Sequence, residues 1–155
     1  MKTKKDPRNR IRRLIKNWAV PVGCGLLFLF LLKFVFFVGY VPTASMEPAI
    51  KEGSIIIGVR IYGELERGDV IVFEHEGRLL VKRIAGLPGD IVYIDEDPAN
   101  KSVSAELPGA ALMLTVPDDC YFVLGDNTDA STDSRCWEEP FITLERILAI
   151  VLTAD

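Results

Sequence analysis

A 21-residue apolar stretch near the N-terminus constrains this chain more than any other feature of its sequence. It runs from Trp18 to Val38 and reads WAVPVGCGLLFLFLLKFVFFV, with Lys33 as its only charge. At about 1.5 Å per residue, a helix of this length crosses a hydrocarbon core about 30 Å thick. Lys33 lies toward the end of the stretch, so its ammonium can extend to the interface. We therefore predict a transmembrane helix over residues 18–38.

The residues before this stretch are strongly basic. Residues 1–16 hold eight lysines and arginines against the single acidic Asp6, a net charge of +7, which leaves −11 for the rest because the total is −4. Basic flanks of membrane helices stay in the cytoplasm. We expect residues 1–17 to form a cytoplasmic arm and residues 39–155 an extracytoplasmic domain. The negative charge of that domain argues against binding of nucleic acid.

A cleaved signal peptide is the alternative interpretation of residues 1–40, because it too begins with a basic and then an apolar region. The apolar stretch is too long for one, and Tyr40 and Pro42 stand where a cleavage site needs small residues. A buried helix of a soluble domain is also disfavoured, since a helix that is apolar all round needs a larger domain to enclose it. We expect an uncleaved, single-pass anchor in the cell membrane, surrounded by lipid.

After the anchor, short apolar runs cut by glycine and proline are typical of strands joined by turns. The predicted fold class is therefore mostly β, with one transmembrane helix and one compact domain of residues 39–155. Turns are expected at Glu76–Gly77 and Pro88–Gly89, and an exposed loop over residues 95–111. The expected strands cover residues 54–61, 69–74, 78–86, 90–94, 121–124 and 147–153.

The residue types narrow the possible chemistry. His75 is the only histidine and the three cysteines form no CxxC pair, so we expect neither a metal site nor a cofactor. His75 stands between two glutamates beside a predicted turn, which favours a solvated hairpin residue over a catalytic one. A Ser-His-Asp triad therefore has little support.

A serine hydrolase without a catalytic histidine can use lysine as its base. A lysine serves at neutral pH only where apolar surroundings disfavour its charged form. Lys82 meets this requirement within LLVKRIAG, with Arg83 expected on the opposite face of the strand. The candidate nucleophile is Ser45 in VPTASMEPAI, which lies within about 25 Å of the membrane because it follows Val38 by seven residues.

Three segments, in this order, resemble motifs of the bacterial type I signal peptidase family. They are PTASMEP, VKRIAGLPGD and VLGDNTDASTDSRCW, and RGDVIVF resembles the strand before the second motif. The resemblance covers nearly all of the chain after residue 20 and corresponds to a compact member. It implies a membrane-bound serine endopeptidase that cuts signal peptides from exported precursors after small residues, through an acyl-enzyme.

The resemblance also implies roles for single residues. It makes Ser45 the nucleophile and Lys82 the general base. Thr43 is expected to be a second oxyanion donor, and Ser131 is expected to orient the lysine. Asp133 and Arg135 are expected to form a supporting ion pair, and Asp126 and Asn127 a supporting turn. An extended substrate is expected beside residues 41–44 and 80–83. The candidates for its shallow side-chain pockets are Val41, Pro42, Met46, Leu80 and Val81, each of which is equally plausible as a core residue.

Alternatives remain open from the sequence. Cys120 and Cys136 bracket the third motif outside the cytoplasm and could form a disulfide, although two thiols are favoured. A Ser/Lys autopeptidase shares the dyad but normally carries a DNA-binding domain, which the anchor replaces here. A membrane-anchored, non-catalytic β module that assists pilus or secretion partners would be favoured only if the dyad were incomplete.

Overall fold

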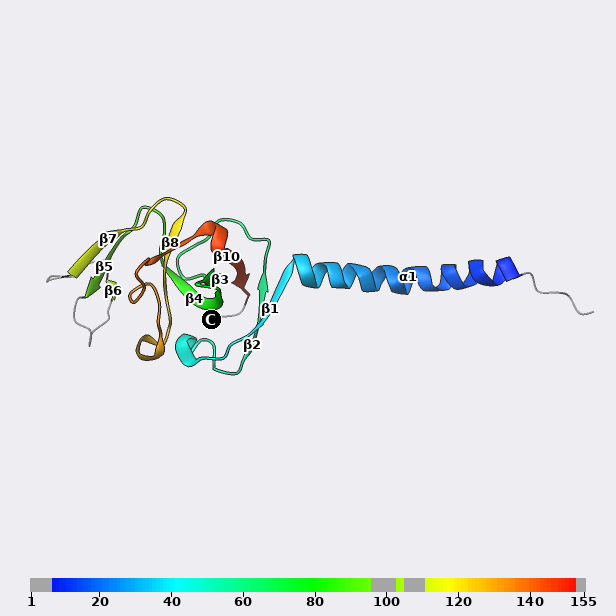
Figure 1. The fold of residues 1–155 in the computed structure, drawn as a ribbon, viewed down its shortest axis with the longest axis horizontal. Helices are drawn as coiled ribbons and strands as arrows, with labels where there is room; N and C mark the ends of the chain where they lie inside the picture. The colour runs from blue at the N-terminus through cyan, green and yellow to red at the C-terminus, as the bar shows by residue number, and fades with distance from the viewer. Residues whose placement is uncertain (1–6, 96–102, 105–110, 153–155) are drawn as a thin grey trace, which may run out of the picture. The chain divides into compact units, whose positions relative to one another are not determined.

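A computed structural model describes residues 7–95, 103–104 and 111–152. The chain divides into two compact units, Met1–Phe36 and Phe37–Asp155 (Figure 1). The first unit contains the single long helix α1, Pro7–Phe34. Its segment Lys16–Phe34 is long and apolar enough to cross a membrane. Apolar side chains along it are exposed, as lipid-facing positions of a membrane helix would be.

The helix ends at Phe34, so the predicted end at Val38 is wrong. Strand β1, Phe36–Tyr40, begins two residues later and pairs with β2. The side chain of Phe37 is buried in a core cluster of the second unit. Composition could not reveal this boundary, because FVFFV is equally apolar on both sides of it. Packing and strand pairing place the last residues of the apolar stretch in the folded domain.

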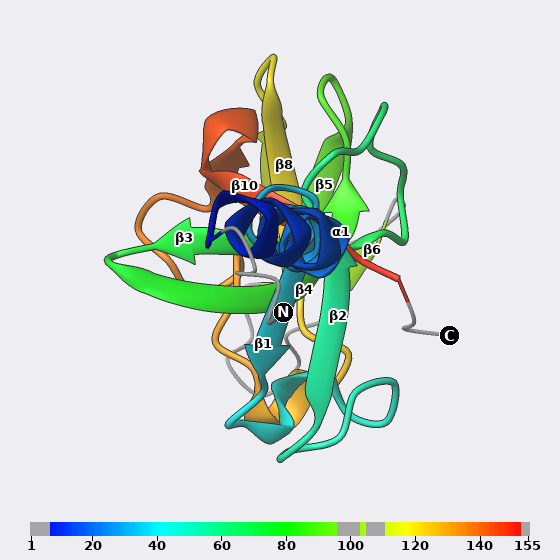
Figure 2. The ribbon, with the colours of Figure 1, turned by 90° about the vertical axis from the view of Figure 1, so that its right-hand side faces the viewer.

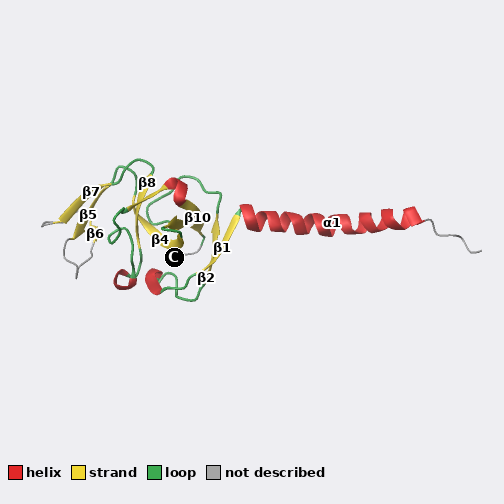
Figure 3. Ribbon diagram, viewed as in Figure 1, coloured by secondary structure: helices red, strands yellow, loops and turns green. Residues whose placement is uncertain are grey.

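The second unit is built on a seven-stranded sheet (yellow in Figure 3). Its strand order is β1-β2-β10-β3-β4-β8-β9. Besides β1, the strands are β2 Ile55–Val59, β3 Val70–His75, β4 Arg78–Gly86, β8 Cys120–Leu124, β9 Phe141–Thr143 and β10 Ile147–Val151. The sequence predicts β4 with both ends correct. It misses β1, which overlaps the apolar stretch assigned to the helix, and β9, whose three residues give no measurable alternation.

A second sheet has three strands in the order β6-β5-β7. They are β5 Ile91–Asp95, β6 Val103–Ser104 and β7 Ala111–Thr115. The expected loop over residues 95–111 is therefore wrong at both ends and in its interior, while residues 96–102 and 105–110 lie outside the described part of the chain. The polar, proline-containing composition of this region favoured a loop. The strands form because β5 pairs antiparallel with β6 and β7, and such pairing cannot be read from composition.

Strand β3 is buried on both faces and divides the core. Val70 and Val72 belong to one cluster, with Met46 and Val41, whereas Ile71 and Phe73 belong to another. Strand β4 pairs with β3 over its first six residues, with Ile71 opposite Lys82. Lys82 is thereby held by the most deeply buried strand of the domain, which fixes its position closely.

The turns that frame β4 are the predicted ones. The hairpin from β3 to β4 turns at Glu76 and Gly77, whose φ angles of 50° and 75° match a two-residue type I′ turn. Gly89, with φ of 84°, lies in the turn between β4 and β5.

Two short 3-10 helices bring distant segments together. They are η1, Ala44–Met46, and η2, Thr128–Ala130, and both views of the ribbon show them side by side (Figures 1 and 2). The segment after β1 and the loop after β8 therefore meet beside β4.

Candidate active site

Ser45 lies in η1 and is only 7% exposed. Its carbonyl accepts a hydrogen bond from the backbone N–H of Asn127 at 3.1 Å. The side-chain amide of Asn127 donates to the carbonyl of Ala44 at 3.1 Å. One residue of the loop after β8 thus holds two successive carbonyls of η1, which fixes the direction of the serine side chain.

Lys82 approaches Ser45 from the centre of β4. Its Nζ donates to Ser45 Oγ at 2.7 Å, a contact between residues 37 positions apart in the sequence. The lysine is 3% exposed. Burial lowers the pKa of Lys82, since an apolar surrounding disfavours the ammonium; the carboxylate of Asp133 opposes this shift and the cation of Arg135 adds to it. The site therefore holds a lysine whose pKa is lowered by burial, in contact with a serine hydroxyl.

Thr43 supplies a second hydroxyl to the serine. Its Oγ1 donates to Ser45 Oγ at 3.3 Å, a long hydrogen bond from an exposed residue. A hydroxyl in this place can rotate toward a charge that develops beside Ser45, as an oxyanion donor must.

Asp133 and Arg135 form the predicted ion pair. Arg135 Nε donates to Asp133 Oδ1 at 2.8 Å and its Nη2 donates to Oδ2 at 2.7 Å. Both side chains are buried, at 0% and 3% exposed for the aspartate and the arginine. Burial raises the pKa of Asp133, but hydrogen bonds from Arg135, Gly125 and Ser131 lower it by more, so the carboxylate stays ionised.

Ser131 does not form the hydrogen bond to Lys82 that the sequence analysis expects. Its hydroxyl donates to Asp133 Oδ2 at 2.7 Å, and no hydrogen bond joins it to Lys82 in the described part of the chain. Asp133 accepts the one hydrogen bond that this hydroxyl can donate, which leaves the lone pairs of the hydroxyl oxygen for another donor. The sequence could not show that the Ser131 hydroxyl would donate its hydrogen bond to the carboxylate of Asp133, two residues away.

Gly125 permits the close approach between this loop and η1. A Cβ built on it would lie 2.6 Å from the carbonyl oxygen of Ser45 and would overlap the side chain of Ser131. Its N–H donates to Asp133 Oδ2 at 2.9 Å. Only glycine fits this position, because any side chain would force the loop away from the serine.

Arg83 is a site residue that the sequence analysis does not identify. Its Nε and Nη2 donate to Asp126 Oδ1 and Oδ2 at 2.8 and 2.7 Å, and its Nη1 donates to the carbonyl of Gly68 at 2.8 Å. Asp126 is therefore a partner of the strand that carries Lys82, in addition to a turn residue. The only available signal is strand alternation, which places Arg83 opposite Lys82 but does not name its partner.

The five expected substrate-binding residues differ in their access to the surface. Val41 and Met46 are 3% and 0% exposed and belong to the hydrophobic core, so they can shape the site only from beneath. Leu80 and Val81 are partly exposed and pack against different core clusters, while Pro42 is exposed. The backbone N–H and carbonyl of Val41 already bond to Ser54 and Gly53, so a substrate strand cannot pair with that residue.

The remaining predictions concern residues outside the dyad. His75 is 7% exposed and stacks on Trp137 at 4.0 Å between ring centroids, so the expectation of a solvated hairpin residue is wrong. Alternation along β3 turns its ring toward Trp137, which is distant in sequence. No disulfide joins Cys120 to Cys136. Among the described residues, no group of three or more His, Cys, Asp or Glu could hold a metal ion.

We expect Asp133→Asn to destabilise the domain by about 3–5 kcal/mol, because it leaves the Arg135 cation buried without its counter-charge. The matched control is Asp129→Asn, an exposed carboxylate of the same loop whose loss should change the free energy of unfolding by at most about 0.5 kcal/mol. Chemical unfolding of both variants in detergent measures this difference. Equal stability of the two variants would contradict the structural importance of the pair.

Comparison with known proteins identifies the family of this chain. The family model described as "Signal peptidase, peptidase S26" matches residues 14–153. Signal peptidase I of Bacillus amyloliquefaciens is 32% identical, over 87% of this chain and 84% of its own length. A probable signal peptidase I-2 of Synechocystis is 32% identical, over 95% of this chain and 74% of its own length. A solved signal peptidase I from Enterococcus faecalis is 29% identical with a TM-score of 0.43, covering 58% of this chain and 98% of that one. The extent of the family match and of the relatives shows that the chain belongs to the signal peptidase family S26, the serine peptidases that remove signal peptides.

Proposed function

We propose that this protein cuts signal peptides from exported precursors with Ser45 as the nucleophile and Lys82 as the general base. The observation that carries the assignment is the 2.7 Å hydrogen bond between Lys82 Nζ and Ser45 Oγ. Both residues are buried, and burial lowers the pKa of the lysine, as a base that works near neutral pH requires. A serine and a lysine that merely belonged to the core would have no reason to share this contact.

Acylation begins when the neutral amine of Lys82 takes the proton of the Ser45 hydroxyl. The oxygen attacks the scissile carbonyl, and the negative charge of the tetrahedral intermediate is stabilised by the Ser45 N–H and the Thr43 hydroxyl. The ammonium of Lys82 then gives its proton to the leaving amine as the C–N bond breaks. The signal peptide stays attached to Ser45 as an ester, and the mature protein leaves with a new N-terminus.

Deacylation uses the same base. Lys82, neutral again, takes a proton from a water molecule that attacks the ester carbonyl, and it returns that proton to Ser45 Oγ as the signal peptide leaves. Asp133 stabilises the ammonium that forms in each half-reaction, since its carboxylate raises the pKa of Lys82 against the effect of burial. Arg135 in turn keeps Asp133 ionised and in place.

The open edge of β4 is suited to an extended substrate. Strand β8 pairs with β4 only from Arg83 onward, and no strand of the described chain pairs with residues 79–82 on that side. A precursor segment can add there as a strand, with backbone hydrogen bonds that are independent of its sequence. Leu80, Val81 and Pro42 are left as the candidates that contact its side chains, above a floor made by Val41 and Met46. A shallow apolar surface of this kind favours cleavage after small residues.

Replacement of either dyad residue should abolish cleavage while the fold persists. We expect Ser45→Ala and Lys82→Ala to lower kcat for a precursor with an Ala-x-Ala site by about 10⁴-fold or more, since each removes a reacting group. The matched controls are Ser54→Ala and Lys51→Ala, which lie outside the dyad and should cleave at the wild-type rate. Mass spectrometry of the products locates the cut. Cleavage by all four variants alike would make the dyad assignment wrong.

The pH dependence of cleavage should reveal the lysine. Because Lys82 must be neutral to act as a base, kcat/KM of the free enzyme should rise with pH. The midpoint should lie below about 10.4, the ordinary lysine value, because burial lowers the pKa of Lys82. The unfolding free energy should also rise with pH between the lowered pKa of Lys82 in the folded protein and the ordinary lysine value. In that range the unfolded chain binds more protons than the folded one. A kcat/KM that does not change from pH 5 to 10 would contradict lysine as the base.

We propose that α1 anchors the protein with residues 1–17 in the cytoplasm and the catalytic domain outside. The apolar segment Lys16–Phe34 and the basic residues before it support this orientation. In cells with a permeable outer surface, added protease should digest the catalytic domain while the membrane is intact. Digestion only after lysis would reverse the assignment.

A further inference from the structure

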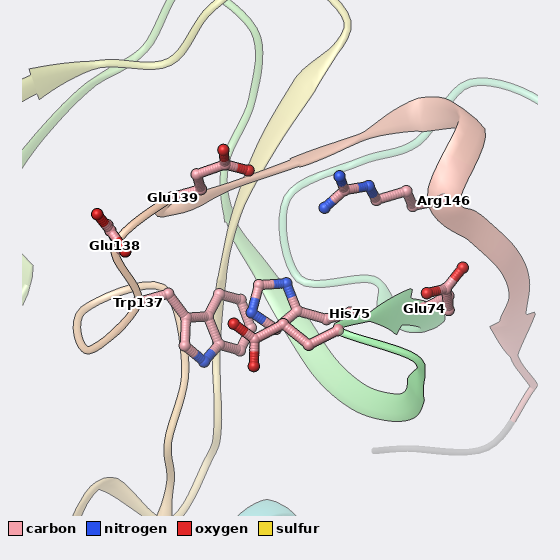
Figure 4. A pocket seen from close by; sticks show the side chains of 7 residues that line it. Glu74, His75, Trp137, Glu138, Glu139 and Arg146 are labelled. Carbon is pink, nitrogen blue, oxygen red and sulfur yellow. The ribbon is translucent and has the colours of Figure 1, made fainter.

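A cavity lies at the hairpin end of β3 and β4, away from the dyad. It has a volume of about 600 Å³, within the range of ligand pockets, and Figure 4 shows its labelled side chains gathered around the ring of His75. The lining consists of Glu74, His75, Glu76, Trp137, Glu138, Glu139 and Arg146. Lys82 lies four positions along β4 from Arg78, the strand partner of His75, or about 13 Å at 3.3 Å per residue. None of the lining residues belongs to the catalytic machinery.

His75 is the unusual residue of this cavity. Its side chain is buried, yet neither ring nitrogen has a hydrogen-bond partner. Buried polar groups are nearly always paired, and an unpaired one costs free energy. A neutral imidazole keeps one nitrogen that can only accept a hydrogen bond. The ring is therefore disposed to accept from an N–H donor that a ligand would bring.

The rim of the cavity is strongly acidic. Four glutamates against one arginine leave three net negative charges when His75 is neutral. Glu74 Oε1 accepts from the Gly77 N–H, whereas Arg146 forms no salt bridge with any of the four glutamates in the described part of the chain. The carboxylates are exposed and not neutralised from within, so the cavity repels anions and attracts cations.

The kind of cation follows from the geometry. The described carboxylates and the imidazole are not grouped closely enough to hold a metal ion. The floor is aromatic, since Trp137 stacks on His75 at an interplanar angle of 27°. A guanidinium is planar, weakly hydrated and able to stack on an aromatic face while it donates from five N–H groups. A lysine ammonium is a compact, strongly hydrated charge that uses such a surface less well.

We propose that this cavity binds an arginine side chain of an extended polypeptide partner. The guanidinium lies over the exposed part of Trp137, donates to the carboxylates of Glu138 and Glu139, and supplies the missing hydrogen bond to His75. The volume exceeds that of one guanidinium, which leaves room for the neighbouring backbone. The site recognises charge and planarity, and it acts independently of the reaction at Ser45.

The single histidine makes the site directly observable. The full chain in detergent micelles, labelled with ¹⁵N at histidine, gives imidazole signals from His75 alone. The probes are acetylated and amidated tetra-arginine, tetralysine and tetraglutamine peptides. Tetra-arginine should shift the ring nitrogen signals saturably, with an affinity about tenfold higher than that of tetralysine. Tetraglutamine should cause no shift.

A pair of charge-matched variants locates the binding. Glu138→Gln/Glu139→Gln should weaken tetra-arginine binding about tenfold, because it removes two carboxylates at the rim. Glu52→Gln/Glu66→Gln removes the same charge from exposed positions elsewhere and should leave the affinity unchanged. Precursor cleavage by both variants should match the wild type, so a failure of this proposal is distinguishable from a failure of the dyad. Equal binding of tetra-arginine and tetralysine, no saturable shift, or unchanged affinity in Glu138→Gln/Glu139→Gln would overturn it.

Discussion

The burial of the Lys82 amine beside Ser45 is the constraint on which the rest of this domain depends. A lysine in a core is unfavourable unless it loses its charge or finds a partner, and burial here lowers its pKa. In the proposed mechanism the same burial lets Lys82 act as the base, and it requires β3 and β4 to be packed tightly enough to keep water away. Deep burial of β3 between two core clusters is therefore a requirement of the chemistry as much as of the fold.

Two arginine–aspartate ion pairs hold the loops that surround the Lys82 amine. Arg83, the residue after Lys82, forms an ion pair with Asp126, and Arg135 forms one with Asp133. Between these pairs, Asn127 fixes the backbone of η1 and Gly125 lets the loop approach the serine. Bidentate pairs of this kind contribute geometry more than stability, since desolvation offsets much of their attraction. The serine, the lysine and the loop after β8 consequently form one connected network.

The acidic cavity lies at the other end of the β3–β4 hairpin, where Trp137 packs against the core and against His75. The indole follows Arg135 by two residues and packs edge-on against Phe73 at 6.1 Å as well as on His75. Strand β4 of the hairpin thus carries Lys82, the proposed base, and the tip of the hairpin contributes to the proposed recognition surface. The two sites share a scaffold and no reacting group.

The sequence by itself determined the apolar helix and the mostly β character of the domain, and it identified Ser45 and Lys82 as the candidate dyad, because those depend on composition, local alternation and short motifs. Strand β4 is the clearest case, since its alternation and both flanking turns are local. The end of the helix at Phe34, the strands β6 and β7, and the burial of His75 depended on pairing and packing between distant residues. The hydrogen bonds from Ser131 to Asp133 and from Arg83 to Asp126 also depended on the folded arrangement. Only the tertiary structure decided these, because each contact joins groups whose side chains could satisfy several partners equally well until the chain was folded.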